Sequence, residues 1–99
     1  MGHSIEILYT KAADKFFRKN ERVRRQYEDA VLELMFGDHP EKVDVKKIKG
    51  QGNTYYRIRI GRYRVIYAVI NGKVVVVKTI LAGSRGDVYK KMNGNLPEK

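Results

Sequence analysis

The chain has 99 residues and 42% apolar content, which suits one domain with a modest core and excludes disorder of the whole chain. It carries 21 Lys and Arg against 11 Asp and Glu, and a formal net charge of +10 attracts polyanions such as nucleic acid. Cysteine is absent, which excludes a disulfide framework and thiol chemistry and suits a reducing cytoplasm.

The first part of the chain predicts a short strand followed by two helices. Residues 4–9, SIEILY, alternate apolar and polar side chains in the manner of a half-buried strand. Thr10 suits a helix N-cap before KAADKFFRK, and Asn20 ends that helix. Apolar residues recur at spacings of three and four through residues 21–36, which predicts a second helix with one buried face.

The rest of the chain predicts three strands and a short helix. Residues 41–53 are interpreted as a basic connector. Residues 54–60 alternate, and a tight turn at Gly61-Arg62 leads into a strand over residues 63–70. Asn71-Gly72 is a strong hairpin signal, and the β-branched run over residues 74–81 is typical of a buried central strand. Ser84 is placed to cap a short helix through DVYKKM.

These elements predict a single α+β domain over residues 1–99 with the order βααβββ and a short C-terminal helix. Two N-terminal helices pack on one face of a small, mostly antiparallel four-stranded sheet. Periodicity does not fix the position of the first strand in that sheet. We expect an ordered core of about residues 4–92, with a frayed tail over residues 93–99.

Basic residues are concentrated between positions 42 and 64, where Asp44 is the only acidic residue. Arg57, Arg59 and Arg64 are expected on a sheet face that the helices leave open, where guanidinium groups can bind phosphates. Tyrosine rings on such a face can stack on unpaired bases. Alternatively, the charges only protect an exposed sheet from aggregation. The candidate RNA-binding residues around these arginines are Lys46, Lys47, Lys49, Arg62 and Tyr55.

The residue types favour electrostatic catalysis at phosphate over other chemistries. His3 and His39 are isolated, so no metal or other cofactor is expected. Ser84 lacks a plausibly placed base, and GSRG lacks the lysine spacing of a phosphate-binding loop. Several arginines can stabilise a pentacoordinate phosphorane while RNA supplies its own 2′-hydroxyl nucleophile. Arg85, in a glycine-flanked loop, and Tyr89, one helical turn later, are expected to complete the cleft.

The block YYRIRIGRYRVIYAVINGKVVVVKTILAGSRGDVYKKM, with the preceding KKIKG, resembles the RelE/ParE toxin superfamily, and its RelE branch most closely. The resemblance covers roughly residues 4–92. It implies the RelE or barnase-like fold and a toxin of a type II toxin–antitoxin system. Such a toxin is a metal-independent, ribosome-dependent endoribonuclease that cleaves mRNA in the ribosomal A site by attack of the 2′-hydroxyl and so inhibits translation.

The family pattern assigns roles to five residues of this sequence. Arg57 and Arg59 stand where RelE has two lysines. Because arginine keeps its proton, they are assigned to phosphate binding and transition-state stabilisation, and the general base stays open. Arg64 would bind the scissile phosphate. Arg85 would stabilise the leaving 5′-oxygen or deliver a proton, and Tyr89 would stack on a base or contact the 2′-hydroxyl.

Partners and alternatives follow from the same resemblance. It implies a RelB-like antitoxin with an acidic helical segment, along with the ribosome and mRNA, in the cytoplasm. No membrane partner is expected, because no apolar run approaches about 18 residues. Two alternatives are a ParE-like inhibitor of DNA gyrase and a non-catalytic RNA-binding module.

Overall fold

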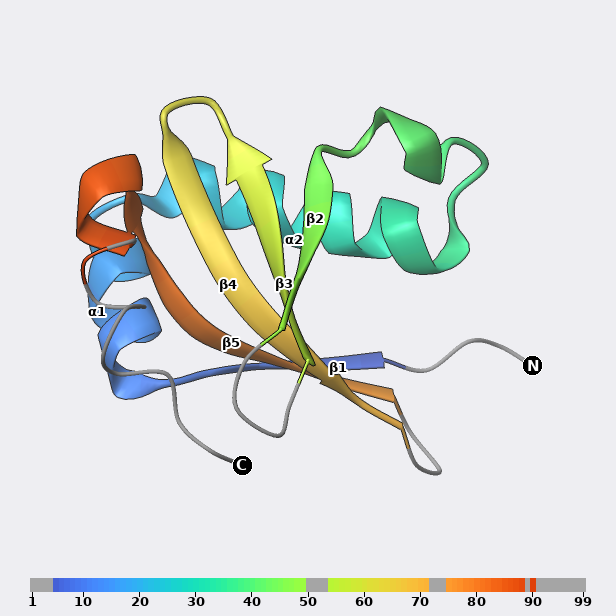
Figure 1. Ribbon diagram of the computed structural model, residues 1–99, viewed down its shortest axis with the longest axis horizontal. Helices are drawn as coiled ribbons and strands as arrows, with labels where there is room; N and C mark the ends of the chain where they lie inside the picture. The colour runs from blue at the N-terminus through green and yellow to red at the C-terminus, as the bar shows by residue number, and fades with distance from the viewer. Residues whose placement is uncertain (1–4, 50–53, 72–74, 89, 91–99) are drawn as a thin grey trace.

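The protein is built on a five-stranded sheet with the strand order β1-β5-β4-β3-β2 (Figure 1). The computed structural model describes residues 5–49, 54–71, 75–88 and 90. Strand β1 pairs in parallel with β5, and all other neighbours are antiparallel. The strands are β1 (Ile5–Tyr9), β2 (Val45–Lys49), β3 (Thr54–Ile60), β4 (Tyr63–Ile70) and β5 (Val75–Ser84).

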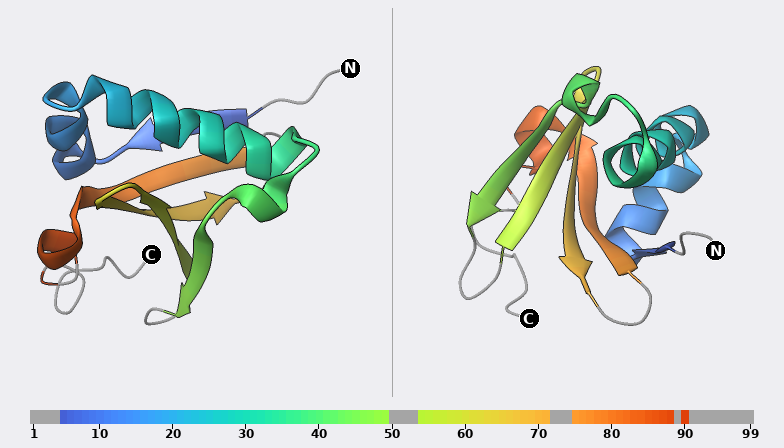
Figure 2. Two further views of the ribbon diagram at one scale, coloured as in Figure 1. Left: turned by 90° about the horizontal axis from the view of Figure 1, so that it is seen from above. Right: turned by 90° about the vertical axis from the view of Figure 1, so that its right-hand side faces the viewer.

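Helices α1 (Lys11–Arg18) and α2 (Glu21–Phe36) cover one face of this sheet (Figure 2). Thr10 caps α1 as predicted, with its hydroxyl oxygen accepting a hydrogen bond from the Ala13 N–H at 3.2 Å. The apolar faces of both helices meet the sheet in the main core, around Phe17, Tyr27 and Ile58. None of the helices among the described residues is long and apolar enough to span a membrane.

The predicted α+β class is confirmed, but the predicted strand count is wrong. Residues 41–53 were expected to be a connector, yet they contain strand β2, preceded by a short 3-10 helix, η1 (Pro40–Lys42). Strand β2 pairs with β3, with Lys46 opposite Arg57 and Ile48 opposite Tyr55. Val45 packs against the main core, so this lysine-rich segment is held by tertiary contacts that its composition does not reveal.

A second, smaller core lies on the sheet face that was expected to be open. Residues 85–88 and 90 form a helical turn, here called the C-terminal turn, on the side of the sheet opposite α2 (Figure 2). Val88 of this turn packs against the sheet, and the cluster buries Tyr55, Ile66, Ile80, Leu81 and Val88. A register shift between β4 and β5 after Ile66 brings consecutive residues of β5 into this cluster. The arginine-bearing face is therefore only partly open.

Buried tyrosines predict a loss of stability in alkali. Burial raises the pKa of Tyr67 to about 12, with a smaller contribution from Tyr56, and burial also raises the pKa of Tyr27. In the unfolded chain these phenols ionise near pH 10. The unfolded state therefore binds fewer protons than the folded state between about pH 10 and 12, and stability falls there by up to about 1.4 kcal/mol per pH unit for each tyrosine.

Urea unfolding at a series of pH values tests this expectation. The contribution of these tyrosines to the free energy of unfolding is fully present and constant below about pH 9, and it falls above about pH 10. Tyr67→Phe should reduce the alkaline slope by up to one proton. An unchanged slope in that variant would contradict the assignment to Tyr67.

Candidate RNA-binding site

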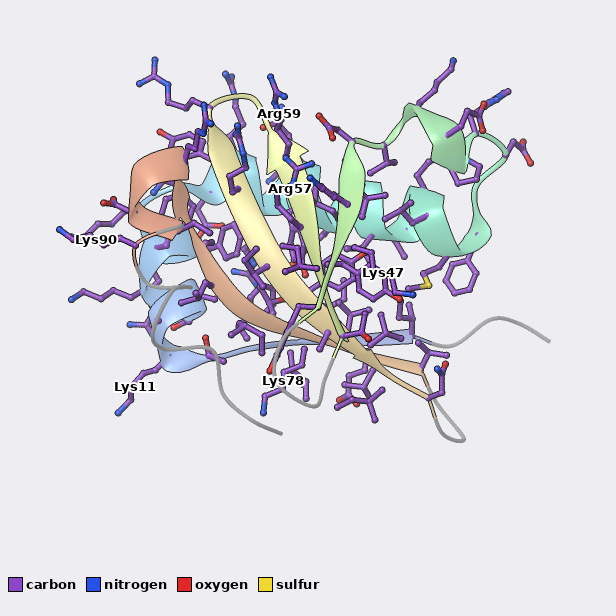
Figure 3. All side chains as sticks on the ribbon, viewed as in Figure 1. Lys11, Lys47, Arg57, Arg59, Lys78 and Lys90 are labelled. Carbon is purple, nitrogen blue, oxygen red and sulfur yellow. The ribbon has the colours of Figure 1, made fainter. Side chains whose placement is uncertain are left out.

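Strand β3 divides its side chains between the two faces of the sheet. Ile58 is fully buried in the main core, with Tyr56 and Ile60 packed against the same cluster. Side chains alternate along a strand, so Arg57 and Arg59 project from the opposite face, which carries the C-terminal turn. Figure 3 shows these two arginines beside each other near the turn between β3 and β4.

The register places arginines of two strands next to each other on this face of the sheet, which is here called the arginine face. Arg59 pairs directly with Arg64 of β4, and Arg64 pairs in turn with Gly83 of β5. The backbone N–H of Arg59 also donates to the Asp44 carbonyl oxygen at 2.9 Å. This hydrogen bond holds Asp44, the residue before β2, next to Arg59. Like charges directly opposite each other in a sheet are destabilising. An anion bound between Arg59 and Arg64 would remove that repulsion.

Gly83 of β5, the partner of Arg64, lies beside the C-terminal turn. A Cβ atom at Gly83 would lie 3.6 Å from the Cβ of Asp87 and 3.7 Å from a methyl group of Val88. Ser84 follows, and its hydroxyl oxygen accepts a hydrogen bond from the Asp87 N–H at 3.4 Å, as expected for the cap of this turn. Arg85 begins the turn and is exposed. The topology therefore brings Arg85 to the same end of the sheet as Arg64.

Two of the arginines have buried nitrogen atoms that find no hydrogen-bond partner among the described residues. These are the Nε atoms of Arg57 and Arg64. Arg64 is only 8% exposed, and its Nη1 donates a long hydrogen bond of 3.4 Å to the Tyr63 carbonyl oxygen. A desolvated cation with unused donors costs free energy unless an anion accepts from it. An anion such as phosphate bound to the Nη groups of these arginines would compensate that cost.

The Asp44 carboxylate partly neutralises two of these arginines. Its Oδ1 lies 3.2 Å from Nη2 of Arg57, and its Oδ2 lies 3.7 Å from Nη1 of Arg59. The sequence marks Asp44 as a lone acid among basic residues but does not give its contacts. The isolation of Asp44 among basic residues could have identified it from the sequence. Its contacts could not, because they depend on the register of β2 against β3.

The peripheral candidates separate into different places. Lys46 pairs with Arg57 and shares its face, whereas Lys47 pairs with Tyr56 and lies on the opposite face, apart from the labelled arginines (Figure 3). Arg62 is exposed in the β3–β4 turn, which Gly61 allows with a positive φ of 59°. Lys49 belongs to β2, but its side chain lies outside the described residues, as does Tyr89 entirely.

Tyr55 is a correction. It was expected to offer its ring to a base, but it is only 3% exposed and belongs to the second core. Its ring lies in a cluster with Ile66 and Ile80, and Ile48, its direct partner in β2, packs against that cluster. Tyr55 therefore supports the sheet beneath the arginines and does not serve as a stacking surface.

The candidate site does not coincide with a cavity that the described part of the molecule contains. A cavity of about 710 Å³ opens beside the end of α2, lined by apolar residues that include Leu34, Val69 and Ile70. Tyr55 is the one predicted site residue in its lining. A surface that binds an extended polyanion needs exposed cations more than depth, so the arginine face remains the candidate. Within the described ranges, no group of three or more His, Cys, Asp or Glu residues is placed to hold a metal ion.

Comparisons with known proteins place the chain in a family. A model of the ParE toxin of the type II toxin–antitoxin system parDE matches residues 7–86. The chain is 50% identical over 40 residues to Toxin RelE3 of Methanocaldococcus jannaschii, which is 40% of this chain and only 43% of that protein's length. It is also similar to a chain of the archaeal RelE–RelB complex from Pyrococcus horikoshii OT3, with a TM-score of 0.57 and 32% identity over 87% of this chain and 98% of that one.

The chain therefore belongs to the RelE/ParE superfamily, the toxins of type II toxin–antitoxin systems. Within it the chain is RelE-like, as the sequence predicted. The fold and the family thus agree.

The neighbouring lysines of β2 allow a matched test of which face binds RNA. Lys46→Ala should weaken binding of a single-stranded RNA oligonucleotide and lower the slope of log affinity against log salt concentration by about 0.7, the value for one lost phosphate contact. Lys47→Ala removes the same charge from the other face and should leave the slope nearly unchanged. Fluorescence anisotropy at several salt concentrations measures both. Equal effects would mean that binding follows net charge and not the arginine face.

Proposed function

We propose that the protein is a ribosome-dependent endoribonuclease that cleaves mRNA in the A site. The observation that carries this proposal is the row of arginines from neighbouring strands, with buried Nε atoms of Arg57 and Arg64 that lack partners among the described residues. Guanidinium groups that converge on one face from two strands gain most when charge develops on a phosphorane bound there. The family membership agrees with a toxin of this kind.

In the proposed reaction RNA supplies the nucleophile and the arginines supply positive charge, while solvent water accepts the proton of the 2′-hydroxyl and protonates the leaving 5′-oxygen. The ribose 2′-oxygen attacks the adjacent phosphorus, loses its proton and displaces the 5′-oxygen, which leaves a 2′,3′-cyclic phosphate and a 5′-hydroxyl. Arg64 binds a non-bridging oxygen of the scissile phosphate, and Arg57 and Arg59 stabilise the negative charge of the phosphorane. Arg85 stands at the same end of the sheet, where it is proposed to stabilise the leaving oxygen. Tyr89 is proposed to stack on a base or to contact the ribose 2′-hydroxyl.

We further propose a RelB-like antitoxin as a partner. The similar structure from Pyrococcus horikoshii OT3 is a RelE–RelB complex, and the net charge of +10 suits a partner segment that is acidic. The proposed site of action is the cytoplasm, where ribosomes and mRNA are found.

Induced expression followed by mapping of mRNA ends tests the nuclease. Cleavage should appear within translated regions, with 5′-hydroxyl ends, and should stop when initiation is blocked. Intact transcripts in halted ribosomes would contradict the proposal. In that case a non-catalytic RNA-binding module would account for the phenotype if loss of RNA affinity and loss of toxicity run in parallel among arginine variants.

A second candidate is inhibition of DNA gyrase, because the matching family model is that of the ParE toxin. This activity needs no phosphate chemistry from the toxin and would leave mRNA intact. A supercoiling assay with purified gyrase separates the two candidates. Inhibition of supercoiling without mRNA cleavage would reverse their order.

A further inference from the structure

Asp44 is positioned between the two arginines of β3 like a bound anion. One carboxylate gives one oxygen to Arg57 at 3.2 Å and the other to Arg59 at 3.7 Å. A phosphodiester would present its two non-bridging oxygens to the same nitrogens in the same way. A phosphodiester bound in this way would occupy the position that the Asp44 carboxylate holds.

The exposed fractions of these side chains indicate that the Asp44 carboxylate can move away at little cost, whereas Arg57 needs a nearby anion. The side chain of Arg57 is only 13% exposed, whereas those of Asp44 and Arg59 are 50% and 53% exposed. A half-exposed ion pair contributes little to stability, so losing the contact with Asp44 costs little once another anion is present. A nearly buried cation without any counterion is costly, so an anion is favoured at Arg57 in every state.

The backbone around Asp44 suits a side-chain movement. Asp44 lies between η1 and β2, and its carbonyl oxygen accepts from the Arg59 N–H at 2.9 Å. Rotation of the carboxylate away from the arginines leaves that hydrogen bond and the pairing of β2 with β3 intact. The carboxylate can then move into solvent without opening the sheet.

We propose that Asp44 is an internal counterion that occupies the phosphate-binding position of Arg57 and Arg59 in the free protein and is displaced when RNA binds. Asp44 thereby sets the affinity of the site for RNA. The identity of the ligand rests on the proposed function, whereas displacement of the carboxylate is a statement about anion binding and is tested without cleavage.

Asp44→Asn tests the proposal because it keeps the size and one carbonyl acceptor but removes the charge. We expect it to bind a short 2′-O-methyl RNA, which cannot be cleaved, at least about fivefold more tightly at low salt. Asp38→Asn is the matched control: it makes the same charge change at another exposed position in the loop before η1, and it should change the affinity less than about twofold.

Each outcome of this measurement decides the proposal. Tighter binding by Asp44→Asn than by Asp38→Asn supports it, and so does loss of that gain when Arg57 and Arg59 are both replaced by Gln. Unchanged, weaker or undetectable binding by Asp44→Asn overturns it, since Asp44 would then hold the arginines in place for the ligand. If that variant does not fold, Asp44→Ser makes the same test. Tighter binding without any mRNA cleavage would retain this inference while the nuclease proposal fails.

Discussion

Arg64→Met is expected to lower the rate of mRNA cleavage by about 100- to 1000-fold, the usual cost of removing one donor that stabilises transition-state charge. Arg64 lies in the middle of the arginine row, between Arg59 of β3 and Gly83 of β5. Methionine fills a similar volume without a charge or a hydrogen-bond donor. The measurement is single-turnover cleavage of mRNA on programmed ribosomes.

The same substitution should leave the fold as stable as before or make it more stable. Arg64 is 8% exposed, its Nε lacks a partner among the described residues, and its hydrogen bond to Tyr63 is long. Replacing a poorly compensated buried cation by an apolar side chain is often neutral or stabilising. Loss of activity without loss of stability would therefore separate a functional role from a structural one.

Arg25→Met provides the control for this experiment. It makes the same change at an exposed position of α2, which covers the other face of the sheet, and it should leave both cleavage and stability nearly unchanged. If Arg64→Met cleaved within about tenfold of the parent rate, the scissile phosphate would not be bound by the β3–β4 face. If it melted well below the parent protein, the lost activity would report unfolding.

Local patterns in the sequence predict the elements whose apolar residues repeat with the period of a helix or a strand. The apolar spacing in residues 21–36 matches the bounds of α2, and alternation in residues 54–60 separates Ile58 from Arg57 and Arg59. The same alternation predicts that these two arginines share one face of the sheet. It does not identify the neighbours of each strand, so the parallel pairing of β1 with β5 does not follow from it.

The errors share one physical cause, which is contact between segments distant in sequence. Residues 45–49, VKKIK, carry three lysines and are typical of a connector, yet Val45 and Ile48 pack against two different cores and hold the segment as β2. Tyr55 alternates in phase with the arginines but is buried in the second core, whose other members come from β4, β5 and the C-terminal turn. The contact of Asp44 with Arg57 likewise follows from strand register and not from spacing.

The second large effect is expected in the main core, at the hydrogen bond between the hydroxyl groups of Tyr27 and Thr79. Both residues are fully buried, and the two oxygens lie 2.7 Å apart. The Tyr27 ring also stacks on Phe17, with centroids 5.7 Å apart. Tyr27→Ala should cost about 3–5 kcal/mol for the lost ring and about 1–3 kcal/mol more for the unpaired Thr79 hydroxyl. Losses of this size approach the whole stability of a small domain.

A double-mutant cycle separates the ring from the hydroxyl group. Tyr27→Phe keeps the stacking but leaves the Thr79 hydroxyl buried without its partner, so we expect a loss of about 1–3 kcal/mol, and Thr79→Val should cost a similar amount for the converse reason. Adding Thr79→Val to Tyr27→Phe removes both polar groups together and should recover most of the loss. Urea unfolding followed by circular dichroism measures all four proteins. Additive losses would mean that each hydroxyl has another partner, because only a mutually dependent pair gives a smaller loss in the double variant than the sum of the single variants.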